Sequence, residues 1–170
     1  MPEPGKRETG NGTRRSVPVS AADQAGMAAA LDQARLAAAA DEVPVGAAVV
    51  RGETVVARAH NETVARRDPT AHAELLAIRQ ALTALGTDRL DDCTLYVTLE
   101  PCAQCAGAIV LAKVARLVFG AYDPKAGMAG SVGDLLRHPS LNHRAEVIGG
   151  VEAEACGELL RDYFRAKRAE

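Results

Sequence analysis

Hydrophobic and polar residues follow two different periods along this chain, and each change of period marks a predicted element. Apolar residues recur at helical spacing over 20–40, which predicts a first helix, and Pro44 ends that pattern. Two short apolar runs follow, 45–50 and 54–57, with Gly52 in the turn between them. The chain is therefore expected to open with a helix and a β-hairpin.

Beyond the hairpin, predicted helices and strands alternate. In order they are a helix over 71–85 with Thr70 as its N-cap and Gly86 as its stop, a strand over 94–99, a helix from Pro101 to about 113, a strand over 116–119 ended by Gly120, a glycine-rich loop over 121–131, a short helix over 132–137, a weak strand at 147–148 and a last helix over 151–168. This alternation favours an α/β layered domain.

Composition suits a globular protein and sets limits on its core. Of the 170 residues, 48% are hydrophobic and 25% charged, but only 3% are aromatic, so a core of Ala, Val and Leu is expected. Residues 1–20 lack apolar periodicity and are predicted to be a disordered tail before a single domain over 21–170. No apolar run approaches the roughly 20 residues of a membrane span, so no membrane partner is predicted. The net charge of −2 neither favours nor excludes a nucleic-acid partner.

The four cysteines indicate metal or redox chemistry rather than structural disulfides. They are Cys93, Cys102, Cys105 and Cys156, and the N-terminus has no apolar stretch typical of a secretory signal. A cytoplasmic location is therefore expected. In that reducing environment a close cysteine pair more often binds a metal or exchanges electrons.

Two short motifs carry the candidate chemistry, and both fall at predicted helix starts. They are His72-Ala73-Glu74 and Pro101-Cys102-Ala103-Gln104-Cys105. Cysteines three residues apart share one helix face, and the positive end of a helix lowers a thiol pKa, which favours the thiolate that zinc binds. With His72 as a third ligand, the fourth tetrahedral position stays open to water, as in catalytic sites. We therefore expect one Zn²⁺ per subunit on His72, Cys102 and Cys105.

Glu74 is the candidate general acid and base. Two residues from His72, it does not share one helix face with that residue, but a carboxylate there can reach water near the metal without ligating the metal. The pattern H-x-E followed by P-C-x-x-C is the known signature of zinc-dependent base deaminases, with zinc ligands and a proton-transferring Glu in these positions.

Three other interpretations of the motifs remain open. The pair Cys102 and Cys105 could be redox-active, although such a pattern does not supply His72 and Glu74. A structural zinc site would need a fourth ligand, for which the candidates are His60, His138, His143, Cys93 and Cys156. Cys93 and Cys156 are expected to be packing residues. A non-catalytic RNA-binding subunit is the third possibility, and the presence of Glu74 argues against it.

From Asp41 to Lys167 the chain resembles the bacterial tRNA-specific adenosine deaminases, of the cytidine deaminase-like zinc deaminase superfamily. The zinc motif is common to the superfamily, whereas the segment from Phe119 to His143 and a phenylalanine near the C-terminus point to the tRNA branch. The matching stretches are Glu42 to Ala47, His60-Asn61, Asp68 to Glu74, Leu95 to Cys102, Cys105 to Ala108, Phe119 to Ala121, Asp123, Lys125 to Gly127, Gly130-Ser131, His138-Pro139 and Leu141 to His143.

The resemblance implies a fold and an activity. The fold would be an α/β, three-layer α/β/α sandwich around a five-stranded mixed sheet, with a helix joining parallel fourth and fifth strands. The activity would be hydrolytic deamination of adenosine to inosine at the wobble position of a tRNA anticodon, by a homodimer. A free-base or nucleoside deaminase of the guanine or cytosine type is the alternative, against which the glycine-rich segment 126–133 and the match at 141–143 argue.

The resemblance also implies where substrate and RNA would bind. It assigns nucleoside binding to Asn61 and Ala73, and an RNA-lining loop to Asp123 with its neighbours. The last helix would flank the anticodon loop through Phe164 and the basic residues Arg165, Lys167 and Arg168. Two departures are Tyr122, where relatives often carry a basic residue, and Gln104, where an apolar residue is common. Arg66 and Arg67 are either an RNA-contacting pair or part of a solvated loop.

Overall fold

The computed structural model describes residues 19–170, so the predicted tail over 1–20 lies almost entirely outside the described residues. The elements are α1 (Ala21–Ala39), β1 (Gly46–Arg51), β2 (Thr54–His60), α2 (Ala73–Leu85), β3 (Cys93–Leu99), α3 (Ala103–Leu111), β4 (Arg116–Ala121), β5 (Glu146–Gly149) and α4 (Ala153–Arg168).

One mixed sheet of five strands organises the molecule, as the resemblance implied. Its order is β2-β1-β3-β4-β5. β1 runs antiparallel to both β2 and β3, while β3, β4 and β5 are parallel to one another. Helix α3 makes the crossover from β3 to β4, which brings the carboxyl ends of these strands to the same edge of the sheet.

The connection from β4 to β5 differs from the prediction. The helix predicted over 132–137 is wrong, because the described segment 122–145 forms turns and a short bridge between Ala129 and Asp134. The Asp134 carboxylate accepts hydrogen bonds from the N–H groups of Leu136 and Arg137, which stabilises a local turn in place of a helix. The two strands are parallel as expected, but a long loop joins them.

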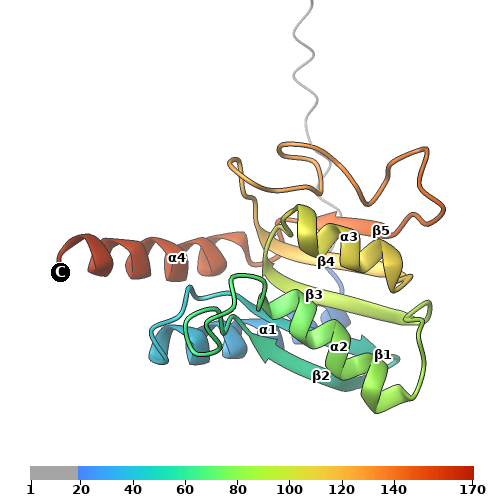
Figure 1. The fold of residues 1–170 in the computed structure, drawn as a ribbon, viewed down its shortest axis with the longest axis horizontal. Coiled ribbons are helices and arrows are strands. Elements are labelled where there is room, and N and C mark those ends of the chain that lie inside the picture. Colours follow the sequence, from blue (N-terminus) through green and yellow to red (C-terminus); the bar gives the residue numbers. More distant parts are fainter. Residues whose placement is uncertain (1–18) are drawn as a thin grey trace, which may run out of the picture.

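Alternate residues of the central strands face two separate cores, which gives the predicted three layers (Figure 1). Leu95, Val97 and Phe119 point to the core beneath α2 and α3. Tyr96 and Val118 point to the core beneath α1 and α4. Each buried strand is therefore apolar on both sides, as the short apolar runs in the sequence indicated.

Small side chains allow α1 to lie almost against the backbone of β1. A Cβ atom at Gly46 would come within 2.0 Å of the Ala30 carbonyl oxygen and 2.4 Å of the Ala34 nitrogen. Ala30 and Ala34 are themselves fully buried. The expected core of Ala, Val and Leu is confirmed here, and close backbone approach compensates for the scarcity of aromatic rings.

Two helix starts lie later than predicted. His72, not Thr70, is the N-cap of α2, because the N–H and hydroxyl of Thr70 both bind the Asp68 carboxylate in a separate turn. Pro101 lies outside α3, whose N-cap is Cys102 and whose last residue is Leu111. Both changes place a candidate metal ligand at the cap itself.

The remaining boundary predictions divide between confirmed and corrected. Gly86 ends α2 with φ 61°, and Gly52 takes φ 62° in the hairpin turn; both values favour glycine. β4 continues through Gly120, which does not end the strand.

Only Cys156 of α4 is buried, and the C-terminal half of that helix extends beyond the sheet (Figure 1).

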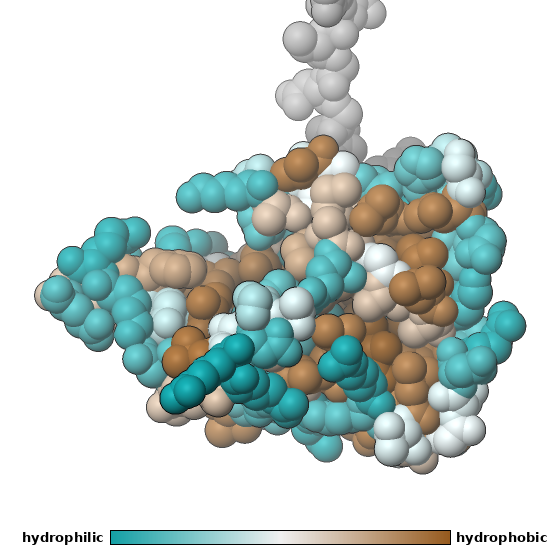
Figure 2. Space-filling model, viewed as in Figure 1, coloured by the Kyte–Doolittle hydropathy of each residue, from teal (hydrophilic) through white to brown (hydrophobic). Residues whose placement is uncertain are grey.

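The surface is uneven in character. On the face viewed in Figure 1, hydrophilic residues gather at the free end of α4, and hydrophobic residues gather over the layer of α2 and α3 (Figure 2). Among residues 19–170, no helix has both the length and the apolar character that crossing a membrane requires.

Candidate active site

Three candidate ligands meet where two helices begin. His72 caps α2, Cys102 caps α3, and Cys105 lies in the first turn of α3. The His72 Nδ1 atom lies 3.5 Å from the Cys102 Sγ atom and 3.6 Å from the Cys105 Sγ atom. Tetrahedral zinc, with bonds of about 2.0 Å to nitrogen and about 2.3 Å to sulfur, requires a nitrogen–sulfur separation of about 3.6 Å. Both nitrogen–sulfur distances therefore match a tetrahedral zinc site, and all three donor atoms lie within 4.8 Å of one another.

The candidates for a fourth protein ligand lie elsewhere. In the described part of the chain, the group that could hold a metal has three members, His72, Cys102 and Cys105. The other histidines make separate hydrogen bonds: His60 with Gln33, His138 with the N–H of Ser140, and His143 with the Val114 carbonyl. Cys93 and Cys156 are buried in the two cores, as predicted. The described residues thus form an open, three-ligand arrangement of the catalytic kind.

The thiols and the imidazole are electrostatically coupled. Hydrogen bonds with Cys105 and His72 lower the pKa of Cys102 to about 3, although partial burial opposes this. The pKa of Cys105 is raised, because it is hydrogen-bonded to Cys102 and buried. The hydrogen bond between His72 and Cys102 raises the pKa of His72. The lowered pKa favours a thiolate at Cys102 beside the imidazole, and a bound divalent cation would favour loss of the proton from Cys105 as well.

Glu74 is buried beside the ligands without being one of them. Its exposed fraction is 4%, and its carboxyl group is hydrogen-bonded to Cys105. Burial raises its pKa to about 7, against the opposing effects of Cys105 and of the His72 charge. A carboxyl group with a pKa near neutrality can both accept and return a proton, which is the property required of a general acid and base.

Asn61 fixes the start of α2 from the end of β2. Its Oδ1 atom accepts a hydrogen bond of 2.8 Å from the N–H of Ala73, and its own N–H donates to the Val45 carbonyl. Because Ala73 stands between His72 and Glu74, this bond orients both. Ala73 is fully buried and its N–H is engaged, so only Asn61 of the two predicted nucleoside-binding residues has a visible role, that of orienting α2.

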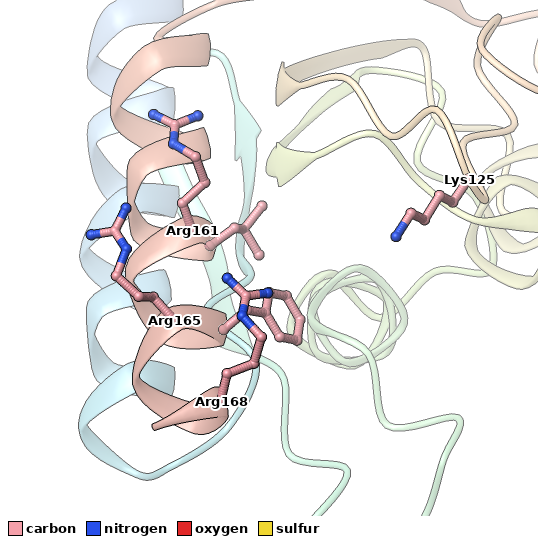
Figure 3. A pocket seen from close by; sticks show the side chains of 6 residues that line it. Lys125, Arg161, Arg165 and Arg168 are labelled. Atoms are coloured by element: carbon pink, nitrogen blue, oxygen red, sulfur yellow. The ribbon is translucent and has the colours of Figure 1, made fainter. Parts of the chain in front are cut away.

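A groove next to α4 brings together some of the predicted RNA-contacting residues. Its lining consists of Lys125, Leu160, Arg161, Phe164, Arg165 and Arg168. Figure 3 shows the arginines along α4 and Lys125 on the loop across from them. Phe164 is 45% exposed and lines the same groove as these cations, of which Arg161 and Arg165 also pair with Glu154 and Asp162 on α4. Basic groups that share a groove with an exposed ring are typical of single-stranded nucleic-acid binding.

Lys167 differs from its neighbours on α4. Its ammonium group lies 2.7 Å from the Asp41 carboxylate and 5.7 Å from the centre of the Tyr163 ring. The structure therefore places Lys167 against the segment after α1 and not in the groove. The resemblance grouped Lys167 with Arg165 and Arg168 as RNA contacts, and for Lys167 that role stays a prediction.

Asp123 shapes the loop that carries Lys125. Its carboxylate accepts hydrogen bonds from the N–H groups of Lys125 and Ala126, and its carbonyl accepts one from Gly127. The predicted loop residue is thus occupied in forming a tight turn. Arg66, by contrast, forms an ion pair with Glu62 on an exposed loop, which favours the solvated interpretation of that segment.

Sequence reasoning missed two buried glutamates that hold loops. Glu100, 2% exposed, accepts hydrogen bonds from the N–H groups of Asp123, Ala129 and Ser131 and from the Ser131 hydroxyl. Burial would raise its pKa, but these bonds outweigh it and the pKa is lowered. Glu42 holds the loop of Val64 and Ala65 in the same way. No sequence signal reveals either role, because the partners are distant backbone groups.

The fold and these motifs have matches among known proteins. A family model described as MafB19-like deaminase matches residues 21–168. The tRNA-specific adenosine deaminase of Bacillus subtilis (strain 168) is 51% identical over 119 residues, which cover 70% of this chain and 73% of that protein.

Solved structures of two deaminases are similar to this chain. A structure from a study of A-to-I editing by tRNA:A34 deaminases at the wobble position of transfer RNA has a TM-score of 0.77 and 44% identity, and covers 80% of this chain and 99% of its own. A guanine deaminase from Nitrosomonas europaea has a TM-score of 0.74 and 30% identity, with 86% of each chain covered. The predicted cytidine deaminase-like α/β fold is confirmed, and the chain belongs to the MafB19-like deaminase family and to the tRNA-specific adenosine deaminases.

Proposed function

We propose that this protein hydrolytically deaminates adenosine to inosine at the wobble position of a tRNA anticodon, using one zinc ion held by His72, Cys102 and Cys105. One observation carries the proposal: three ligand atoms converge on one point, and the Glu74 carboxyl group is buried against one of them. Relatives and structural neighbours that act on tRNA support the choice of substrate.

The protein groups divide the work of the reaction. Zinc, when bound, supplies a Lewis acid that makes water more acidic, to a pKa of about 7. Glu74 accepts a proton from the attacking water and delivers it to N1 of the adenine as the water oxygen bonds to C6. Glu74 then passes the second water proton to the amino group, so that ammonia leaves and inosine remains. Its pKa of about 7 suits both transfers.

The groove beside α4 suits an RNA substrate. Anticodon loops expose unstacked bases, which proteins bind by stacking and by contacts to the phosphates. We assign the phosphate contacts to Arg165 and Arg168 and a stacking contact to Phe164, all of which line the groove. Asp123 acts on the same loop by shaping the turn of Lys125.

The quaternary state and location follow from the family resemblance. We propose a homodimer, and the hydrophobic surface over α2 and α3, including Leu111 with 81% exposure, supports an interface there. We also propose that the enzyme acts in the cytoplasm, where its substrate would be found.

The deciding experiment offers the enzyme two classes of substrate. The purified protein is incubated with tRNA that carries adenine at the wobble position, and separately with free guanine, cytosine and adenosine. We expect sequencing to show A-to-G reads at the wobble base, with no ammonia released from the free compounds. Release of ammonia from guanine without editing of the RNA would instead establish the free-base alternative, to which the similarity with the guanine deaminase points.

A further inference from the structure

The turn that carries Lys125 is fastened to one buried carboxylate on both of its sides. On the N-terminal side, the Asp123 N–H donates to Glu100 Oε1 over 3.0 Å. On the C-terminal side, the N–H groups of Ala129 and Ser131 donate to Glu100 Oε2 over 3.1 and 3.0 Å. A buried carboxylate with four donors is strongly held, because each bond to a charged acceptor is about twice as strong as a neutral one.

Two further contacts show that the loop is packed closely around this carboxylate. A Cβ atom at Gly127 would lie 2.3 Å from the Glu100 carboxyl carbon, so any side chain there would displace the carboxylate from its hydrogen bonds. The N–H of Met128 donates to the carbonyl of Pro101, the residue between Glu100 and Cys102. The segment 123–131 is therefore attached directly to the turn that presents the metal ligand.

Lys125 is the part of this segment that faces α4. It lines the groove opposite Arg161 and Arg168 (Figure 3). The position of the turn consequently sets the distance between the two walls of the groove.

We propose that Glu100 is a positioning residue for the RNA-binding groove: its carboxylate holds the Lys125 turn in register with the metal-binding turn. The proposal rests on the proposed function, since it assigns the groove to RNA. Glu100 acts on the affinity for the RNA and leaves the chemistry at the metal unchanged, because its hydrogen bonds go to the loop and none goes to His72, Glu74 or Cys105.

The variant Glu100→Gln tests this with little change of shape. Whichever way the amide is oriented, its NH₂ group faces at least one backbone N–H that the carboxylate accepted, so at least one anchor of the loop is lost. With an anticodon stem-loop RNA, we expect KM to rise about tenfold, since a charge-assisted bond is lost, while kcat changes less than about twofold and metal content stays at one per chain. A matched control is Asp23→Asn, the same chemical change in a buried carboxylate that binds Arg116 at the start of β4, whereas Glu100 follows the end of the parallel strand β3.

Two results would overturn the proposal. One is loss of metal or of kcat with KM unchanged, which would place the role of Glu100 in the metal site. The other is an equal rise of KM in Asp23→Asn, which would indicate general destabilisation. The double variant Glu100→Gln with Lys125→Ala adds a third criterion. If Glu100 acts through Lys125, the KM of the double variant should be no higher than that of the worse single variant. A KM increase equal to the product of the two single increases would contradict the proposal.

Amide hydrogen exchange separates this proposal from the proposed function. Without any RNA, the amides of 123–131 should exchange at least about tenfold faster in Glu100→Gln than in the unchanged protein and in Asp23→Asn. Unchanged exchange there would refute the role of Glu100. If exchange rises but the unchanged enzyme edits no RNA, the positioning of the loop stands and the choice of substrate is wrong.

Discussion

Each face of the sheet carries a buried carboxyl group, and the two groups have opposite electrostatic environments. Beneath α1, Asp23 accepts two hydrogen bonds from Arg116, at 3.1 and 3.2 Å, and one of 2.8 Å from the Tyr96 hydroxyl. These contacts, with Arg116 foremost, lower the pKa of Asp23. Beneath α2 and α3, burial raises the pKa of Glu74 to about 7.

The contrast distinguishes a structural polar group from a reactive one. The charge of Asp23 is neutralised within its own cluster, so that cluster can only stabilise the fold. Burial raises the pKa of Glu74 more than the Cys105 hydrogen bond and the His72 charge lower it. A carboxyl group perturbed by burial beside candidate metal ligands is typical of functional sites.

The largest expected effect comes from removing the imidazole of the reactive cluster. His72→Ala should abolish deamination and reduce zinc from one ion per chain to below about a tenth, since two thiolates alone bind far more weakly. Metal analysis by mass spectrometry after dialysis measures this. His143→Ala, which removes an imidazole bound to the Val114 carbonyl, should keep its zinc. Full zinc occupancy in His72→Ala would show that the ligand set is wrong.

Glu74→Gln separates proton transfer from metal binding. We expect kcat to fall by about 10³-fold, within the range found for loss of a general acid and base, while zinc content stays unchanged. Glu42→Gln is the matched control, because Glu42 is as deeply buried but binds a loop away from the ligands, and its kcat should remain within a few-fold. A Glu74→Gln enzyme with near-normal turnover would end the assignment.

Asp23→Asn should show the opposite behaviour, with an effect on stability and none on chemistry. We expect the free energy of unfolding to fall by about 2 kcal/mol at neutral pH, because hydrogen bonds to a charged group are lost. In the folded protein the pKa of Asp23 lies below its ordinary value of 3.8, so the carboxylate contributes its full stability above pH 3.8. That contribution is lost as the pH falls through the folded pKa. Urea unfolding at pH 7 and pH 3 measures the difference, and a pH-independent difference would contradict the ion pair.

The smallest effect concerns two basic residues of α4, Arg168, which lines the groove, and Lys167, which pairs with Asp41. Arg168→Ala should weaken RNA binding a few-fold and reduce the slope of log affinity against log salt by about one unit. Lys167→Ala removes the ion pair with Asp41, so RNA binding should stay unchanged and stability should fall by no more than about 1 kcal/mol. Filter binding at several salt concentrations tests both. Equal losses of affinity would return Lys167 to the RNA-binding surface.

The elements of the fold were largely predictable because short apolar runs mark the buried strands and helical spacing of apolar residues marks the first helix. The errors occurred where long-range contacts determine the local structure. The N-cap of α2 lies at His72 because Asn61, from the end of β2, binds the next N–H group. The helix predicted over 132–137 is absent, because Asp134 forms a turn there and Glu100 holds the residues just before it.

The candidate metal ligands were predictable because their spacing is a local property of two helix starts. The groove was predictable only in part. Arg165, Lys167 and Arg168 look equivalent in the sequence. In the structure Arg165 and Arg168 line the groove, whereas Lys167 forms an ion pair with Asp41, just after α1. The roles of Lys125 and Glu100 become visible only in the folded structure. Glu100 binds the N–H of Asp123, which is distant in the sequence, and Lys125 shares the groove with residues of α4.

The near-contact of α1 with β1 has a consequence for how this protein tolerates change. The atoms around Gly46 belong to the helix backbone, which cannot rotate aside as a side chain can. An added methyl group at Gly46 would have to displace the whole helix, and with it the carboxylate of Asp23 that meets Arg116. Laboratory evolution of this protein should therefore accumulate few mutations where α1 contacts β1 and many on the outer side of α1.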